Sequence, residues 1–143
     1  MLFDPENPVV RLCAEGMDME ALGKSEAATR LFRKAWALAS NNLEKMVAAH
    51  YFARQQKNVI EKLKWDELAL DLAISIKDKK IQALYPSLHL NIGQCFEDLG
   101  NYPKAKEHYE LASKYVPLLN DDGYGNFISR GISDAIRRID SKL

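Results

Sequence analysis

The chain has 143 residues, of which 47% are hydrophobic and 28% are charged, and its twenty Lys and Arg residues balance twenty Asp and Glu residues. This length predicts one domain or a short repeat array, and the composition excludes disordered, collagen-like and membrane-spanning proteins. A formal net charge of zero lacks the basic surplus of proteins that depend on nucleic acid or anionic membranes, so neither is expected as an obligatory partner.

Helical periodicity dominates the first half of the chain, where residues rich in Ala, Leu, Glu and Lys are separated by capping signals. Asn7 before Pro8 predicts the beginning of the first helix, and Gly23 predicts its end. Ser25 is predicted to cap a second helix that runs to about residue 40. After a break at 41–42, a third helix is expected to run to about residue 56.

The second half continues the helical pattern. Asn58 followed three residues later by Glu61 is a capping box, which predicts the start of a fourth helix. Pro86 interrupts or begins the fifth helix, and Gly100 ends it. The stretch 120–125, rich in Asp and Gly, predicts the one long loop of the chain. The last three of seven expected helices lie at about 79–99, 103–115 and 126–141.

An internal repeat relates the first pair of helices to the pair near the C-terminus. Small and bulky residues recur at the same spacing in both, as expected if two helices of a hairpin approach closely at a small residue. The two series are Gly93, Phe96, Gly100, Ala105, Tyr109, Ala112 and Pro117, and Gly16, Met19, Gly23, Ala28, Phe32, Ala35 and Ser40.

These residues resemble the tetratricopeptide repeat (TPR), whose pattern is W-x2-L-G-x2-Y…A-x3-F…P. The C-terminal pair matches closely, and the first pair matches with Ser40 in place of proline. The middle repeat is irregular and about nine residues longer than the first, like the longer TPR variants. His50 stands where a small residue is expected, which leaves the local register open, with Ala49 as the alternative close contact.

The resemblance implies an all-α, right-handed TPR-type superhelix (α-solenoid) of three antiparallel helix hairpins plus a capping helix. We expect a single domain over 1–143, with repeats at about 9–42, 43–85 and 86–119 and the capping helix at 126–141. A solenoid end requires such a cap, because a repeat cannot bury its own apolar face. The apolar residues expected to face the core are Phe127, Ile128, Ile132, Ala135, Ile136 and Ile139.

Catalytic and metal-binding signatures are missing from the sequence. No phosphate-binding loop is present, and none of His50, His89 and His108 has a second His or Cys three or four residues away, as a helical zinc site would have. Cys13 and Cys95 are far apart and are expected to be reduced thiols. We therefore expect no enzyme, no cofactor and no metal. An enzyme remains the minor alternative if His50 or His89 meets a carboxylate in a pocket.

In the TPR family, the first helix of each hairpin lines a concave groove that accepts a peptide or helix. The matching positions that we expect to bind a partner are Cys13, Met17, Tyr51, Arg54, Asn91 and Gln94. Further groove positions are Val10, Ala14, Glu20, Val47, Ala48, Gln55, Leu90, Glu97 and Asp98. The clamp with which some TPR domains hold chaperone tails is absent, because none of the matching positions is basic. Whether Met17 and Tyr51 face the groove or pack between repeats is left open.

The leading hypothesis is a non-enzymatic interaction module or adaptor that binds a protein or peptide in this groove. The alternative is an RNA- or ribosome-associated accessory protein that uses Arg130, Arg137 and Arg138 of the last helix, although a solvated face explains these arginines as well. A homodimer is compatible with the leading hypothesis. The start of the chain, with Asp4 and no basic segment before an apolar stretch, is unlike a secretory signal, so we expect a cytoplasmic protein.

Overall fold

The computed structural model describes residues 3–143, which form seven α-helices and two short 3-10 helices, with no β-strand among the described residues. The predicted all-α class is confirmed. The chain divides into two compact units, the first ending at Lys77 and the second beginning at Asp78. Each unit is described by itself below.

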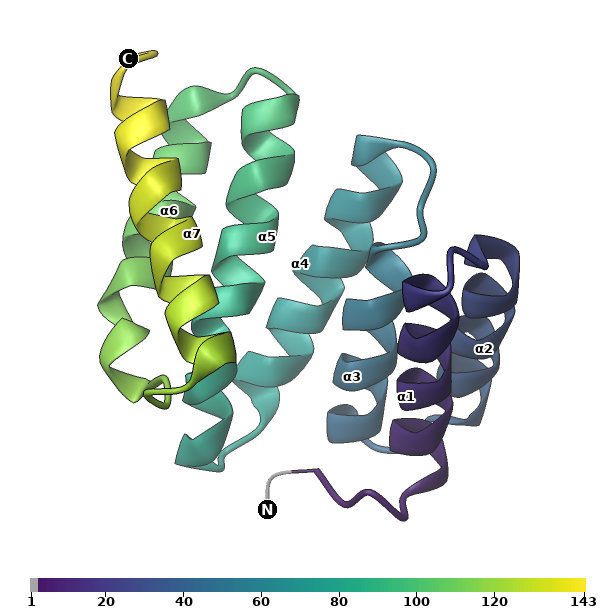
Figure 1. Cartoon of the computed structure of the whole chain (residues 1–143). Coiled ribbons are helices and arrows are strands. Elements are labelled where there is room, and N and C mark those ends of the chain that lie inside the picture. Colours follow the sequence, from purple (N-terminus) through teal and green to yellow (C-terminus); the bar gives the residue numbers. More distant parts are fainter. Residues whose placement is uncertain (1–2) are drawn as a thin grey trace. The chain divides into compact units, whose positions relative to one another are not determined.

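The first unit consists of two helix hairpins. Helix α1 (Pro8–Ala21) pairs with α2 (Ser25–Leu38), and α3 (Asn42–Ala53) pairs with α4 (Val59–Ser75) (Figure 1). Helix α3 also packs against both α1 and α2, which joins the hairpins. This unit therefore contains the two N-terminal helix pairs that the sequence predicts.

Side-chain caps fix three of these helix starts. The Oδ1 atoms of Asn7, Asn41 and Asn58 accept backbone N–H bonds from Val9, Glu44 and Glu61, each at 2.8 Å. Such caps satisfy donors that have no partner within the helix. The prediction that Ser25 caps α2 is wrong, because Lys24 occupies the cap position and makes no side-chain cap bond.

The second unit begins with a 3-10 helix (Lys79–Leu84) that leads into α5 (Tyr85–Asp98). Helix α5 pairs with α6 (Tyr102–Lys114), and after a second 3-10 turn (Val116–Leu118) helix α7 (Gly123–Asp140) packs against both. The sequence placed the start of α7 too late, at residue 126. The Asp122 carboxylate accepts the Gly125 N–H at 2.7 Å and caps the helix earlier, so part of the predicted loop is helical.

The hairpins α1–α2 and α5–α6 share the same turn. Gly23 and Gly100 have positive φ angles of 74° and 79°, a conformation that favours glycine. In each turn the glycine N–H bonds back to a carbonyl three residues earlier at 3.0 Å, and the following N–H bonds back five residues at 2.9 Å. This pair of bonds is the Schellman motif, so the first helix of each of these hairpins ends in the same way.

The same two hairpins share a close contact between a glycine and an aromatic ring. A Cβ atom built on Gly16 would overlap the Phe32 ring, and one built on Gly93 would overlap the Tyr109 ring. Both rings are fully buried. The α3–α4 hairpin has no glycine at the equivalent position. Of the two residues that the sequence offers there, Ala49 is fully buried and His50 is half-buried.

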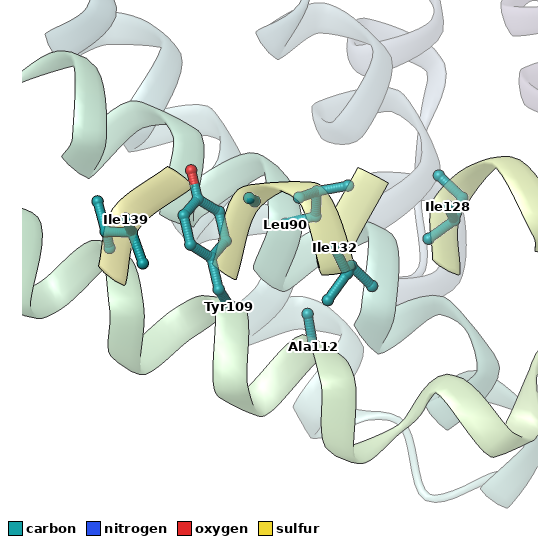
Figure 2. Close-up of a cluster of buried hydrophobic side chains, with 8 residues drawn as sticks. Leu90, Tyr109, Ala112, Ile128, Ile132 and Ile139 are labelled. Carbon is teal, nitrogen blue, oxygen red and sulfur yellow. The ribbon is translucent and has the colours of Figure 1, made fainter. Parts of the chain in front are cut away.

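Helix α7 supplies an apolar face to the second unit. Figure 2 shows Ile128, Ile132 and Ile139 of α7 lying over Leu90 of α5 and over Tyr109 and Ala112 of α6. This cluster confirms the predicted apolar face, with one correction: Phe127 is 74% exposed. Phe127 lies one residue before Ile128, and adjacent helical residues do not share a face.

Candidate functional site

The groove positions predicted on α1 differ in exposure. The Met17 side chain is 41% exposed, whereas Cys13 is only 2% exposed. Burial raises the pKa of the Cys13 thiol to about 12, so this side chain is neutral and packs as a small apolar group. Of these two α1 residues, Met17 is the one that presents its side chain to solvent.

Tyr51 and Arg54 belong to a connected set at the ends of α1 and α3, which we call the Glu20 cluster (Glu20, Tyr51, Arg54 and Gln55). The Arg54 guanidinium lies 5.6 Å from the centre of the Tyr51 ring and 2.9 Å from Glu20 Oε1. This second contact is an ion pair without the geometry of a hydrogen bond. Gln55 Nε2 donates to Glu20 Oε2 at 2.6 Å. These contacts link the four polar side chains to one another.

Tyr51 also has a packing role. Its ring stacks on the buried ring of Phe32, with centroids 5.7 Å apart, so the half-buried Tyr51 is continuous with the core of the first unit. Beside it, burial first and the charge of Arg54 second lower the pKa of His50 to about 4. The buried Nδ1 atom of His50 has no hydrogen-bond partner among the described residues. This imidazole is therefore neutral near pH 7 and meets no carboxylate through Nδ1.

The groove positions predicted in the second unit lie on α5, where Asn91 and Gln94 are half-buried. The next predicted position, Glu97, is occupied by internal bonds. Arg138 donates to both Glu97 oxygens at 2.7 and 2.9 Å, and Tyr109 and Lys142 donate at 2.6 and 2.9 Å. The Arg138 bond is the main cause that lowers the pKa of Glu97 to about 2. Glu97 therefore joins helices rather than presenting an acidic surface.

The three arginines of α7 have different surroundings. Arg138 is engaged by Glu97, and Arg137 forms an ion pair with Asp134 one turn earlier on the same helix. Arg137 is 75% exposed, and exposed pairs of this kind are weak. Arg130 is exposed and makes neither a hydrogen bond nor an ion pair within residues 3–143. These arginines do not form one uniformly free basic face.

A histidine pair in the second unit was not predicted. Nδ1 of His89 on α5 and Nδ1 of His108 on α6 lie 3.0 Å apart, and the His108 ring stacks on Phe96. Burial is the main cause that lowers both pKa values, for His89 to about 4. The residues are 19 apart in sequence, a separation at which no local motif signals a pair. Both rings are neutral at pH 7, and one donates to the other.

A second feature that the sequence did not indicate is a hollow of about 520 Å³ beside α1. We call it the α1 hollow. Its apolar lining comes from the N-terminal segment and from one face of α1, and its charged lining comes from three side chains of α1. The lining residues are Phe3, Pro5, Val10, Arg11, Ala14, Glu15 and Asp18. Of these, Val10 and Ala14 were predicted groove positions, but the sequence gives no signal that Phe3 and Pro5 line a hollow together with α1.

Within residues 3–143, no three His, Cys, Asp or Glu side chains come together in a way that could hold a metal ion. Nor does any helix of the described chain combine the length and apolar character that crossing a bilayer requires. His89 lies against the imidazole of His108, whereas the enzyme alternative requires a carboxylate beside His50 or His89.

Comparison with protein-family models, with characterised proteins and with solved structures found no match to this chain.

Proposed function

We propose that this protein is a TPR-like helical-repeat adaptor that binds a segment of another protein and catalyses no reaction. The proposal includes a right-handed superhelix of three hairpins with α7 as the cap, and a cytoplasmic location. Its support is the agreement between two hairpins, α1–α2 and α5–α6, in the glycine turn and in the glycine–ring contact. The glycine–ring contact joins the glycine and the phenylalanine position of the TPR pattern.

The observation that carries the binding function is the exposed Met17 beside the ordered Glu20 cluster on α1 and α3. Methionine adapts to partners of different shape, and Tyr and Arg are enriched among residues that dominate binding energy. Because Glu20 and Tyr51 already hold Arg54, a partner would not have to order this side chain, and the entropic cost of binding is smaller.

The alternative of RNA binding through α7 receives no such support. Phosphate recognition needs guanidinium groups that are free to replace the counterions condensed on the nucleic acid. Arg138 is bound to a carboxylate that is itself only 8% exposed, so its charge is already neutralised. We therefore do not propose a nucleic-acid partner.

The test is site-specific photocrosslinking in cells that express the protein. A benzophenone side chain is introduced at Met17 or, as a matched control in the same unit, at Ile74, which is 57% exposed on α4. We expect a discrete crosslinked protein from position 17 and not from position 74. The change Arg54→Ala should reduce that crosslink several-fold without loss of helical circular dichroism, whereas Tyr51→Ala is unsuitable because it removes packing on Phe32. Equal crosslinking from both positions would refute the assignment.

A further inference from the structure

The α1 hollow has an apolar floor that continues along one face of α1. Val10 and Ala14 are four residues apart, and the exposed Met17 follows three residues later, so the three side chains form a stripe on the helix. At 1.5 Å per residue the stripe is about 10 Å long. Phe3 and Pro5 of the N-terminal segment line the same hollow as Val10 and Ala14. An elongated apolar stripe suits a peptide segment that offers two or more apolar side chains in a row.

The charged residues around the hollow are mainly acidic. Glu15 and Asp18 line it together with one base, Arg11, and Asp4 and Glu6 flank Pro5 in the chain. Neither Glu15 nor Asp18 forms an ion pair among the described residues, although Glu20 on the same helix is paired with Arg54. The carboxylates beside the hollow are thus free to meet positive charge from outside the unit.

We propose that the α1 hollow binds a basic amphipathic segment of another protein, whose apolar side chains lie on Val10 and Ala14 and whose Lys or Arg side chains face Glu15 and Asp18. The inference rests on the proposed function, because it names the chemistry of the partner. It extends the proposed contact from Met17 along α1 to the α1 hollow.

The experiment uses the full chain and three labelled synthetic peptides. The first carries leucines four residues apart among lysines, the second has glutamate in place of every lysine, and the third has alanine in place of both leucines. Fluorescence anisotropy measures their binding at low and at physiological salt. We expect the first peptide to bind at least about tenfold more tightly than the other two, and its affinity to fall as salt rises. Equal binding of the basic and acidic peptides overturns the proposal.

Two pairs of variants locate the site. Ala14→Arg fills the hollow, and its control, Ala37→Arg, places the same side chain on an exposed position of α2. The double change Glu15→Lys and Asp18→Lys reverses the charge, and its control reverses the exposed Glu67 and Asp71 of α4 by the same amount. Only the first member of each pair should weaken the basic peptide, by about tenfold or more. Equal losses within a pair would show that binding follows net charge.

A second copy of this chain is the competing occupant. Its helix α7 exposes Phe127 and, one turn later, Arg130, which is the combination of apolar and basic side chains proposed for the partner segment. Size-exclusion chromatography with light scattering decides between the two. A dimer that Ala14→Arg dissociates overturns the proposal of a separate partner, and a monomer that still binds the basic peptide supports it. If the peptide fails to bind while Met17 still crosslinks specifically, the adaptor function stands and this inference falls.

Discussion

The carboxylate of Glu97 joins the three α-helices of the second unit. It belongs to α5 and accepts bonds from Tyr109 of α6, from Arg138 of α7 and from Lys142 just beyond α7. Its side chain is only 8% exposed, so these bonds replace water as its solvation. A single residue therefore fixes the C-terminal end of α7 against the hairpin beneath it.

Replacing Glu97 by Gln should loosen α7. The amide can still accept the Tyr109 hydroxyl, but it loses the attraction of Arg138 and Lys142, which are 44% and 37% exposed and can be hydrated instead. We expect a loss of about 1–2 kcal/mol in the free energy of opening α7, measured by amide hydrogen exchange. The matched control is the exposed neighbour Asp98→Asn, and an equal loss in both variants would contradict the assigned role.

The lowered pKa of Glu97 also predicts how the stability of α7 depends on pH. Because the folded pKa of Glu97 is lowered from 4.5 to about 2, its contribution is complete above pH 4.5 and is lost as the pH falls from 4.5 towards 2. The protection of α7 amides in the native chain should decrease across this window. In Glu97→Gln that part of the pH dependence should be missing.

At the scale of the helical elements, the hairpin depends on how closely its two helices approach. The Tyr109 ring of α6 lies directly on Gly93 of α5, where no Cβ atom fits. Gly131 of α7 is different, because a Cβ atom there would lie 3.5 Å from Leu90 Cδ2, which is ordinary van der Waals contact. An added methyl group would therefore clash at Gly93 but fit at Gly131.

We expect Gly93→Ala to destabilise the protein by about 1–3 kcal/mol, because the added methyl forces apart two well-packed helices. Gly131→Ala should be neutral or stabilising by up to about 1 kcal/mol, because alanine is the better helix former. Urea unfolding followed by circular dichroism measures both. The close approach of α5 and α6 would be refuted if the two substitutions had the same effect.

At the scale of the whole molecule, the division after Lys77 predicts where a protease cuts first. Residues 76–78 have no helical structure, and Lys77 is exposed and lies between α4 and the 3-10 helix. Brief trypsin treatment of the folded chain should therefore cleave after Lys77 before any other site, and mass spectrometry should find fragments 1–77 and 78–143. Lys24 in the α1–α2 turn is also exposed and serves as the internal comparison. An earlier cut there would contradict the division.

The sequence predicted most helices because their signals are local. Asn7 and Asn58 cap helices with their own side chains, and Gly23 and Gly100 end helices through positive φ angles, so neighbouring residues contain the information. The errors at helix starts are also local. Ser25 matches the residue type of a cap without making the bond, and Asp122 makes the bond in a stretch that resembles a loop.

The candidate sites were less predictable, because they depend on contacts between distant residues. Cys13 matches an exposed position of the repeat pattern but is buried, and Glu97 matches a groove position but binds Arg138, 41 residues away. The pairing of His89 with His108 and the α1 hollow likewise have no local signal. Periodicity assigns a residue to a face of its helix, and it does not specify what lies opposite.

The sequence alone determined that this is an all-α chain of helix hairpins with a repeated glycine and aromatic pattern, because caps, turns and helical periodicity act over a few residues. Tertiary structure decided which of the patterned side chains are free to bind. It buried Cys13, neutralised Arg138 and left Met17, Glu15 and Asp18 at the surface. The physical reason is that burial and charge pairing are properties of packed neighbours, and the neighbours come from helices far apart in the chain.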